Sequence, residues 1–254
     1  MQRLALLGMR FMDPTLELPV SDQLTVTIRR AVKGARHIRA RPNGEGIFTF
    51  EGLPGLLDYE FGAEAPAPRD FIVSVTDPGG RFLPVCTVVS LPAAERLQEF
   101  YLFPAPTRPP VSGIAAIRGQ LWDKIADRPA AHALAEVTGS GSKTWYGVAD
   151  ERGCIAVFVS YPAIQVSGPN PHTPPPLLYS QVFNLTLKVR YQAAALALPT
   201  DSAVPDLADI LSQPYGKIYA TVAGPPANTY TLAVPFGQDF TLRTGAESTL
   251  LIRP

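Results

Sequence analysis

Proline is the feature that most restricts how this chain can fold. There are 27 prolines in 254 residues, spread along the whole length. Proline lacks a backbone N–H group and fixes φ, so it interrupts helices and is confined to turns, loops and strand edges. Apolar runs lie between the prolines, and the hydrophobic fraction of 46% is enough for a packed core. We therefore expect short strands joined by many turns.

Several of these runs alternate apolar and polar side chains with a period of two. The clearest is 183–191, and Leu24–Ile28 has the same pattern, which indicates a half-buried strand. Further strands are expected at 46–50, 71–75, 85–89, 114–122, 133–137, 143–148, 154–159, 230–236, 240–242 and 249–252. The predicted fold class is all-β, with two antiparallel Ig-like or transthyretin-like β-sandwich domains.

A proline-rich stretch separates the two predicted domains. Four prolines fall within Phe103–Pro110, which favours an extended, semi-rigid spacer. We predict an N-terminal sandwich at 1–102, a linker at 103–112 and a C-terminal sandwich at 113–254. The second domain is expected to contain a long loop at 161–177, which is either functional or a surface excursion.

Two segments have helical character. A short helix is predicted at 203–212 in the second domain, capped by Asp201 or Ser202 and ended by Gln213–Pro214. It is expected to close one end of the sandwich, with partner binding as the alternative. Residues 92–100 are expected to form one or two helical turns, because Pro92 suits a first helical position.

Charge and cysteine content limit the function classes. Lys+Arg and Asp+Glu both number 22, so no general field attracts nucleic acid. Cys86 and Cys154 are predicted to be buried free thiols. The N-terminal apolar run ends at Arg10, which is too short for a signal peptide, and no run is long enough to span a membrane. We expect a protein that is cytoplasmic at synthesis, in a released or an intracellular particle, with leaderless export left open.

Two groups of residues are candidates for partner binding. The basic stretch that contains Arg29, Arg30 and Arg36 is either a solvated hairpin tip or a site for an anionic partner. The aromatic residues Trp145, Tyr146, Tyr161 and Tyr179 either form a platform for a glycan or protein, or pack in the core.

Reactive groups do not cluster in the sequence. The three histidines are scattered without metal-ligand spacing, and a Cys154–His132 dyad could arise only from tertiary proximity. Acidic residues near turns, such as Asp123 with Asp127 or Asp150 with Glu151, fit turn chemistry, with Ca²⁺ binding as the alternative. We predict that the chain is not an enzyme and holds no cofactor or metal.

The two halves share a pattern of polar turn, glycine and strand. It occurs at Asn43–Gly55 and at Val148–Val157, the second preceded by 119–123 and 128–137. Over 20–90 and 113–191 this resembles the carboxypeptidase-regulatory-like (transthyretin-like) β-sandwich family. Two departures are Ala131, where the family favours glycine, and Cys154, where it favours phenylalanine after the glycine. The resemblance implies a non-catalytic module for folding support, adhesion or docking.

The tandem layout, with its Phe71–Pro84 stretch, is also similar to accessory proteins of phage-tail-like contractile injection particles. That resemblance implies a structural or docking subunit of a larger assembly, bound to protein partners by surface complementarity or edge-strand addition. The alternative is a carbohydrate- or surface-binding adhesion module.

Overall fold

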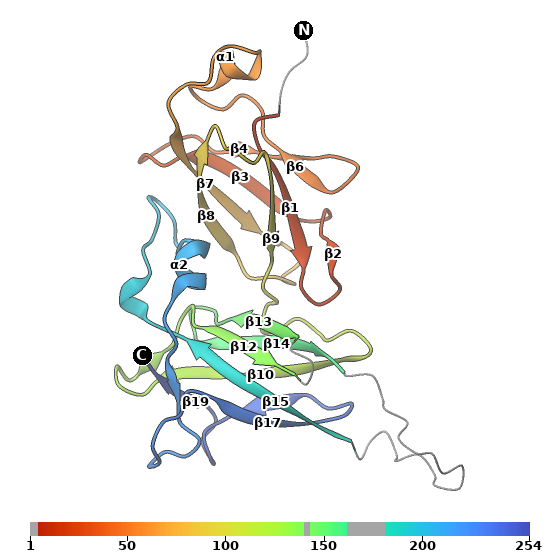
Figure 1. Cartoon of the computed structure of the whole chain (residues 1–254), viewed down its shortest axis with the longest axis vertical. Coiled ribbons are helices and arrows are strands. Elements are labelled where there is room, and N and C mark those ends of the chain that lie inside the picture. The colour runs from red at the N-terminus through yellow and green to blue at the C-terminus, as the bar shows by residue number, and fades with distance from the viewer. Residues whose placement is uncertain (1–4, 140–142, 162–180) are drawn as a thin grey trace, which may run out of the picture. The chain divides into compact units, whose positions relative to one another are not determined.

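The computed structural model describes residues 5–139, 143–161 and 181–254 (Figure 1). The chain forms two compact units, of which the first is Met1–Phe103 with Ala194–Ser212 and the second is Pro104–Ala193 with Gln213–Pro254. The predicted all-β class is confirmed, since the described helices are short: α1 (Leu57–Glu60), α2 (Leu207–Ser212) and the 3₁₀ turn η2 (Ala193–Ala195). No helix among these residues is long and apolar enough to cross a membrane.

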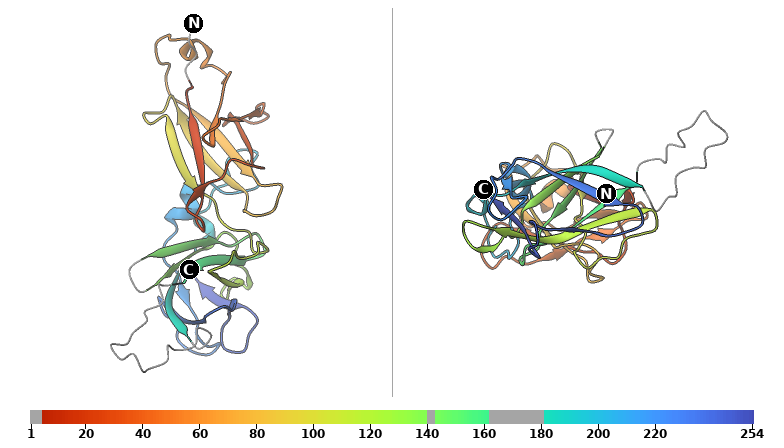
Figure 2. Two further views of the ribbon diagram at one scale, coloured as in Figure 1. Left: turned by 90° about the vertical axis from the view of Figure 1, so that its right-hand side faces the viewer. Right: turned by 90° about the horizontal axis from the view of Figure 1, so that it is seen from below.

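The first unit contains two sheets (Figure 2). One has the strand order β2-β1-β6-β5, with β9 also paired to β1: β1 (Gly8–Asp13), β2 (Leu18–Pro19), β5 (Arg41–Pro42), β6 (Ile47–Thr49) and β9 (Leu97–Tyr101). The other has the order β4-β3-β7-β8: β3 (Thr25–Arg30), β4 (Ile38–Arg39), β7 (Arg69–Thr76) and β8 (Val85–Leu91).

The second unit also contains two sheets. In one, the long strand β10 pairs with β11, β14, β18 and β19, and β19 pairs with β16: β10 (Ile114–Asp123), β11 (Arg128–Pro129), β14 (Cys154–Ser160), β16 (Lys217–Ile218), β18 (Phe240–Leu242) and β19 (Leu250–Arg253). The other has the order β13-β12-β15-β17: β12 (Leu134–Thr138), β13 (Thr144–Val148), β15 (Val182–Arg190) and β17 (Tyr230–Pro235). Their inward-facing side chains, including Ile117, Val157 and Leu187, form one apolar core.

The two units have equivalent strand pairings. In each, the first strand pairs antiparallel with a two-residue strand that follows it, and parallel with strands from the end of the unit. The turn before β6 or β14 is also the same. Asn43 Oδ1 accepts from the N–H groups of residues 45 and 47, and Asp150 Oδ1 accepts from those of 152 and 154. The shared turn predicted from sequence is thereby confirmed.

The helical turns expected at 92–100 are replaced by β9. This strand pairs in parallel with β1 from Gly8↔Leu97 to Met12↔Tyr101. Tertiary pairing overrides the local signal, because a distant strand supplies the backbone hydrogen bonds that a helix would otherwise make.

The predicted linker is attached to the second unit. Arg118, on β10, donates hydrogen bonds to the carbonyl oxygens of Pro106 and Arg108, and Arg108 itself is buried. Both guanidinium groups also lie over the Phe158 ring, at 5.7 Å for Arg108 and 5.4 Å for Arg118. The residues from Pro104 onward therefore belong to the second unit, and the semi-rigid spacer predicted at 103–112 is not a separate segment.

The predicted helix at 203–212 also differs from expectation. It forms only at Leu207–Ser212 and, with the preceding residues from Ala194, belongs to the first unit. Figure 1 draws α2 beside β8, and a β-bridge joins Asp206 to Cys86 on that strand. The chain therefore leaves the second unit after Ala193, contributes this segment to the first, and returns at Gln213.

Candidate functional site

The outer face of the sheet β13-β12-β15-β17 carries the most distinctive polar cluster in the described part of the chain. Register places Tyr146 opposite Glu136 and Glu136 opposite Lys188, so the three side chains share one face. The alternate residues, such as Val137 and Leu187, point into the apolar core. Strand periodicity therefore presents this polar set outward.

Arg190 and Tyr215 complete the cluster. Arg190 Nε donates to Glu136 Oε1 at 2.6 Å, and the Tyr215 hydroxyl donates to Glu136 Oε2 at 2.9 Å. Arg190 Nη2 donates to the Tyr215 hydroxyl at 3.0 Å, and the guanidinium lies 4.4 Å from the Tyr215 ring centroid. We call Tyr146, Glu136, Lys188, Arg190 and Tyr215 the tyrosine face.

The return of the chain from the first unit positions Tyr215. A β-bridge pairs Tyr215 with Arg190, and the N–H of Gly216 donates to the carbonyl of Val189 at 2.9 Å. A Cβ at Gly216 would lie 2.6 Å from the carbonyl oxygen of Arg253, so only glycine allows this close approach. Tyr215 is therefore held by backbone pairing and not by its side chain alone.

Electrostatics favour the charged form of Arg190. Burial opposes the charge of Arg190, but the hydrogen bond and the charge of Glu136, with the contacts of Tyr215, outweigh it and raise the pKa of Arg190. The ion pair is thus preformed, with Glu136 largely buried. Tyr146 and Tyr215 remain 43% and 51% exposed, so the face offers two rings beside oriented polar groups.

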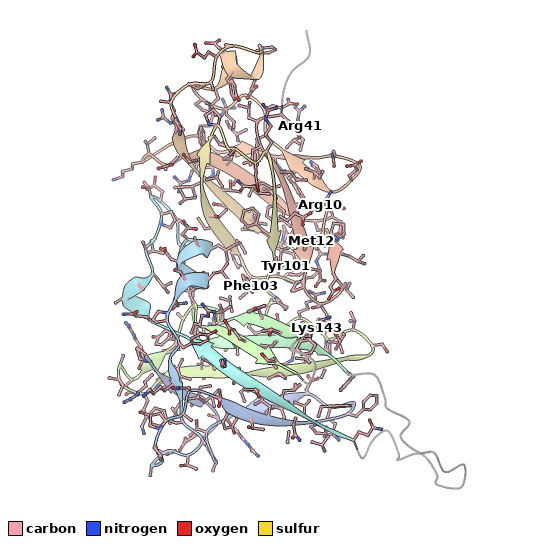
Figure 3. All side chains as sticks on the ribbon, in the orientation of Figure 1. Arg10, Met12, Arg41, Tyr101, Phe103 and Lys143 are labelled. Atoms are coloured by element: carbon pink, nitrogen blue, oxygen red, sulfur yellow. The ribbon has the colours of Figure 1, made fainter. Side chains whose placement is uncertain are left out.

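The other predicted aromatic residues lie elsewhere. Trp145 points toward the core and is partly buried, with the Lys143 ammonium 5.7 Å from its ring (Figure 3 labels Lys143). Tyr161 packs between Phe183 and Phe236, with ring centroids 5.4 and 4.5 Å away. Tyr179 lies outside the described residues. Of the three predicted platform residues that the structure describes, Tyr146 is the one that belongs to the tyrosine face.

The predicted basic patch is divided by the structure. Arg36 is exposed and Arg30 is half-buried, but Arg29 is only 2% exposed. Arg29 lies on β3 beneath the Ala194–Ser212 segment and donates a hydrogen bond to the carbonyl of Thr200. It therefore cannot take part in a surface anion site. Alternation along β3 gave no sign of this, because the cover comes from a segment far along the sequence.

The cysteines and His132 lack the electrostatics of a reactive pair. Burial raises the pKa of Cys154 and that of Cys86, so both favour the thiol. Burial also lowers the pKa of His132, which favours neutral imidazole. An activated cysteine needs the reverse, a thiolate stabilised by a nearby positive charge.

The acidic turn residues make turn hydrogen bonds. Asp123 Oδ1 accepts from the N–H groups of Ile125 and Ala126, and Asp127 accepts from the Trp122 indole at 3.0 Å. Within the described ranges, no group of three or more His, Cys, Asp or Glu side chains is arranged to hold a metal ion. This geometry gives the alternative of Ca²⁺ binding no support.

A hollow of about 570 Å³ lies in the first unit. It is lined by Ser21, Gln23, Leu24, Thr25, Arg39, Ala40, Pro42, Phe48, Pro78 and Gly79. Arg39 is the one charged residue in this lining. General acid–base chemistry needs converging titratable groups, and this hollow does not supply them.

Sequence reasoning missed Glu136, Arg190 and Tyr215. The alternation of 183–191 marks Arg190 as outward-facing, whereas 133–137 does not alternate and Glu136 is its one polar residue. Neither pattern predicts that the two strands are neighbours. Tyr215 follows a proline outside any clear strand, so its place depends on the path of the chain.

Comparisons with known proteins show a loose likeness to multi-domain β-sandwich structures. No family model matches, and no curated protein matches. The shaft pilin SpaA from Lactobacillus rhamnosus GG is 9% identical with a TM-score of 0.27, over 98% of this chain and 96% of that one. A C-terminal fragment of the pilus adhesin SpaC from the same organism is 8% identical with a TM-score of 0.25, over 97% and 96%.

A putative adhesin from Bacteroides ovatus is 10% identical with a TM-score of 0.25, over 94% of this chain and 88% of that one. At these scores the likeness carries no functional argument. The carboxypeptidase-regulatory-like pattern remains a resemblance without a family assignment, and the contractile-particle interpretation gains no support.

Proposed function

We propose that this chain is a non-catalytic surface-binding module, and that the tyrosine face is where it binds its ligand. The observation that carries the proposal is the pair of exposed rings, Tyr146 and Tyr215, beside the preformed Glu136–Arg190 ion pair. Both belong to the second unit and rest on a paired sheet, which holds binding groups more rigidly than a loop does.

A saccharide is the ligand class that this chemistry fits. Exposed tyrosines offer apolar ring faces at a small entropic cost, and their hydroxyls donate and accept hydrogen bonds. A sugar ring has an apolar face and a rim of hydroxyls, which match these two features. Glu136 and Arg190 neutralise one another and Lys188 adds one positive charge, so a neutral or weakly acidic saccharide is expected.

The raised pKa values of Cys86 and Cys154 favour the thiol over the nucleophilic thiolate, which is consistent with a binding role. Membership of a larger assembly is compatible with a binding role, but no contact among the described residues favours a contractile particle. We therefore put surface binding ahead of the assembly-subunit interpretation.

The test is binding of the full chain to a panel of immobilised neutral and acidic oligosaccharides. We expect Tyr215→Ala and Tyr146→Ala each to weaken binding at least about tenfold, equivalent to about 1.4 kcal/mol. Tyr215→Phe keeps the ring but loses the bond to Glu136, so its effect should be smaller. Tyr101→Ala is the matched control, because Tyr101 is 58% exposed on β9 (Figure 3).

Two results would remove the proposal. One is that no member of the panel binds the wild-type chain. The other is that the Tyr215 and Tyr146 variants bind as tightly as the Tyr101 variant.

A further inference from the structure

Part of the outer face of the sheet β4-β3-β7-β8 is buried, although the outer face of a sheet is ordinarily exposed to solvent. Arg29, Ile72 and Cys86 alternate with the core residues Ile28, Val73 and Val85, so they point away from the core of the first unit. Each is nevertheless at most 2% exposed. Val88, two residues farther along β8 on the same face, is 38% exposed. Another segment of the chain must therefore cover this face over Arg29, Ile72 and Cys86 but not over Val88.

The cover is the Ala194–Ser212 segment. The Arg29 guanidinium donates to the carbonyl of Thr200, and the N–H of Gly34 donates to Asp201 Oδ2 at 2.9 Å. At the other edge, Ser202 hydrogen-bonds with Cys86, and Asp206 pairs with Cys86 in a parallel bridge. These contacts span the sheet from β3 to β8, with Ile72 between them.

The segment has the features of a bound peptide. It touches the sheet through backbone pairing and two anchors, Leu207 and Ile210, which are both buried. Its helix is six residues long, too short to be stable without a docking surface. Both ends of the segment continue into the second unit. Ala194–Ser212 therefore belongs to the first unit only through its contacts with the sheet and not through chain connectivity.

The cover leaves buried donors unsatisfied. Nε and Nη1 of Arg29 have no hydrogen-bond partner within the part of the chain that is described. Burying unpaired guanidinium groups costs free energy. A covered face with unsatisfied donors is less stable than a fully satisfied one, which lowers the free energy needed to detach the segment before it can dock on either copy.

We propose that the outer face of β3, β7 and β8 is an acceptor surface for the Ala194–Ser212 segment, and that it takes this segment from a second copy of the chain as well as from its own. Exchange of an identical element forms the same contacts between copies that already exist within one, so it costs little. Because the donor and acceptor surfaces differ, exchange can close a dimer or continue from copy to copy.

The experiment uses Cys86 as the reporter, in a Cys154→Ala background that leaves one thiol. In one chain, residues 196–211 are replaced by a Gly/Ser sequence of equal length. We expect Cys86 to react with a maleimide at least about tenfold faster in this chain than in the intact chain. A synthetic peptide of residues 194–212 should restore protection in a saturable way.

A point variant keeps the test decisive if the replaced chain does not fold. Ile210→Glu should raise the Cys86 rate at least about tenfold, because it removes an anchor. Ala208→Glu, at an exposed position of the same helix, should leave the rate unchanged. Equal rates in these two variants, with native circular dichroism in both, overturn the proposal.

Native mass measurement decides whether a second copy is the partner. An equimolar mixture of intact and segment-replaced chains should give a heterodimer that the 194–212 peptide competes away. If the peptide protects Cys86 but no heterodimer forms, the second-copy assignment is wrong. Failure of the peptide to protect a folded, segment-replaced chain removes the acceptor surface itself.

Discussion

The two units share their strand pairings but differ in what lies on the outer face of their second sheet. In the first unit this face is covered by Ala194–Ser212, whereas in the second it carries the exposed tyrosine face. The difference arises at one connection. A short connection at 77–84 joins β7 to β8, but residues 191–229 join the equivalent strands β15 and β17. The same fold thus has a covered outer face in the first unit and an exposed one in the second. The 191–229 connection contributes to both, because it contains Ala194–Ser212 and Tyr215.

Glycine substitution at the shared turn should produce the largest difference between the units. Gly46 and Gly153 both have φ of +75°. A Cβ at Gly153 would lie 2.4 Å from the carbonyl oxygen of Leu121, but a Cβ at Gly46 would come no closer than 3.2 Å to Ser21. We expect Gly153→Ala to lower the free energy of unfolding by about 3 kcal/mol and Gly46→Ala by about 1 kcal/mol.

Urea denaturation followed by circular dichroism measures both changes. Gly44→Ala is the control, since a Cβ there meets nothing within 4 Å. Equal losses for Gly46→Ala and Gly153→Ala would mean that backbone strain alone sets the cost, and that the close approach in the second unit does not matter.

The hairpin of the first unit should make that unit sensitive to acid. The Asp77 carboxylate accepts from the Arg81 N–H at 2.8 Å and from Arg81 Nε at 3.1 Å. Burial opposes its charge, but these bonds and the charge of Arg81 outweigh burial and lower the pKa of Asp77 below its ordinary 3.8. A lowered folded pKa contributes stability above pH 3.8, and that stability is lost as the pH falls through the folded pKa.

We therefore expect Asp77→Asn to lower the free energy of unfolding at pH 7 by about 1–2 kcal/mol and to flatten its loss below pH 4. Denaturation at pH 7 and pH 3 provides the measurement. Asp22→Asn is the matched control, because Asp22 pairs with the same Arg81 but is 66% exposed. An unchanged acid slope in the Asp77 variant would contradict the assignment.

Substitution of the turn residue should have the smallest effect on the free energy of unfolding. Asn43 and Asp150 accept the same pair of backbone hydrogen bonds in the two units. Asn43→Asp should therefore change the free energy of unfolding by no more than about 0.5 kcal/mol at pH 7. A larger change in thermal denaturation would show that the two turns are not interchangeable.

Local signals predicted most of the strands and one of the site residues. Alternation placed the strands at 24–28 and 183–191, and the polar turn before glycine predicted the matching entries to β6 and β14. Tyr146 is predicted from sequence as a platform residue, because an exposed aromatic side chain on a strand can bind a partner. The structure places it at the surface. These features depend on neighbours within a few residues, so the sequence contains them.

The sequence by itself determined the period-two alternation, the turns that proline, asparagine and glycine impose, and hence two all-β units. Only the tertiary structure decided that 97–101 forms a strand, that Ala194–Ser212 completes the first unit, and that Glu136, Arg190 and Tyr215 meet. Each of these depends on pairing between segments far apart along the chain. Local propensity cannot encode such pairing, because the stabilising free energy comes from partners that no short window of sequence contains.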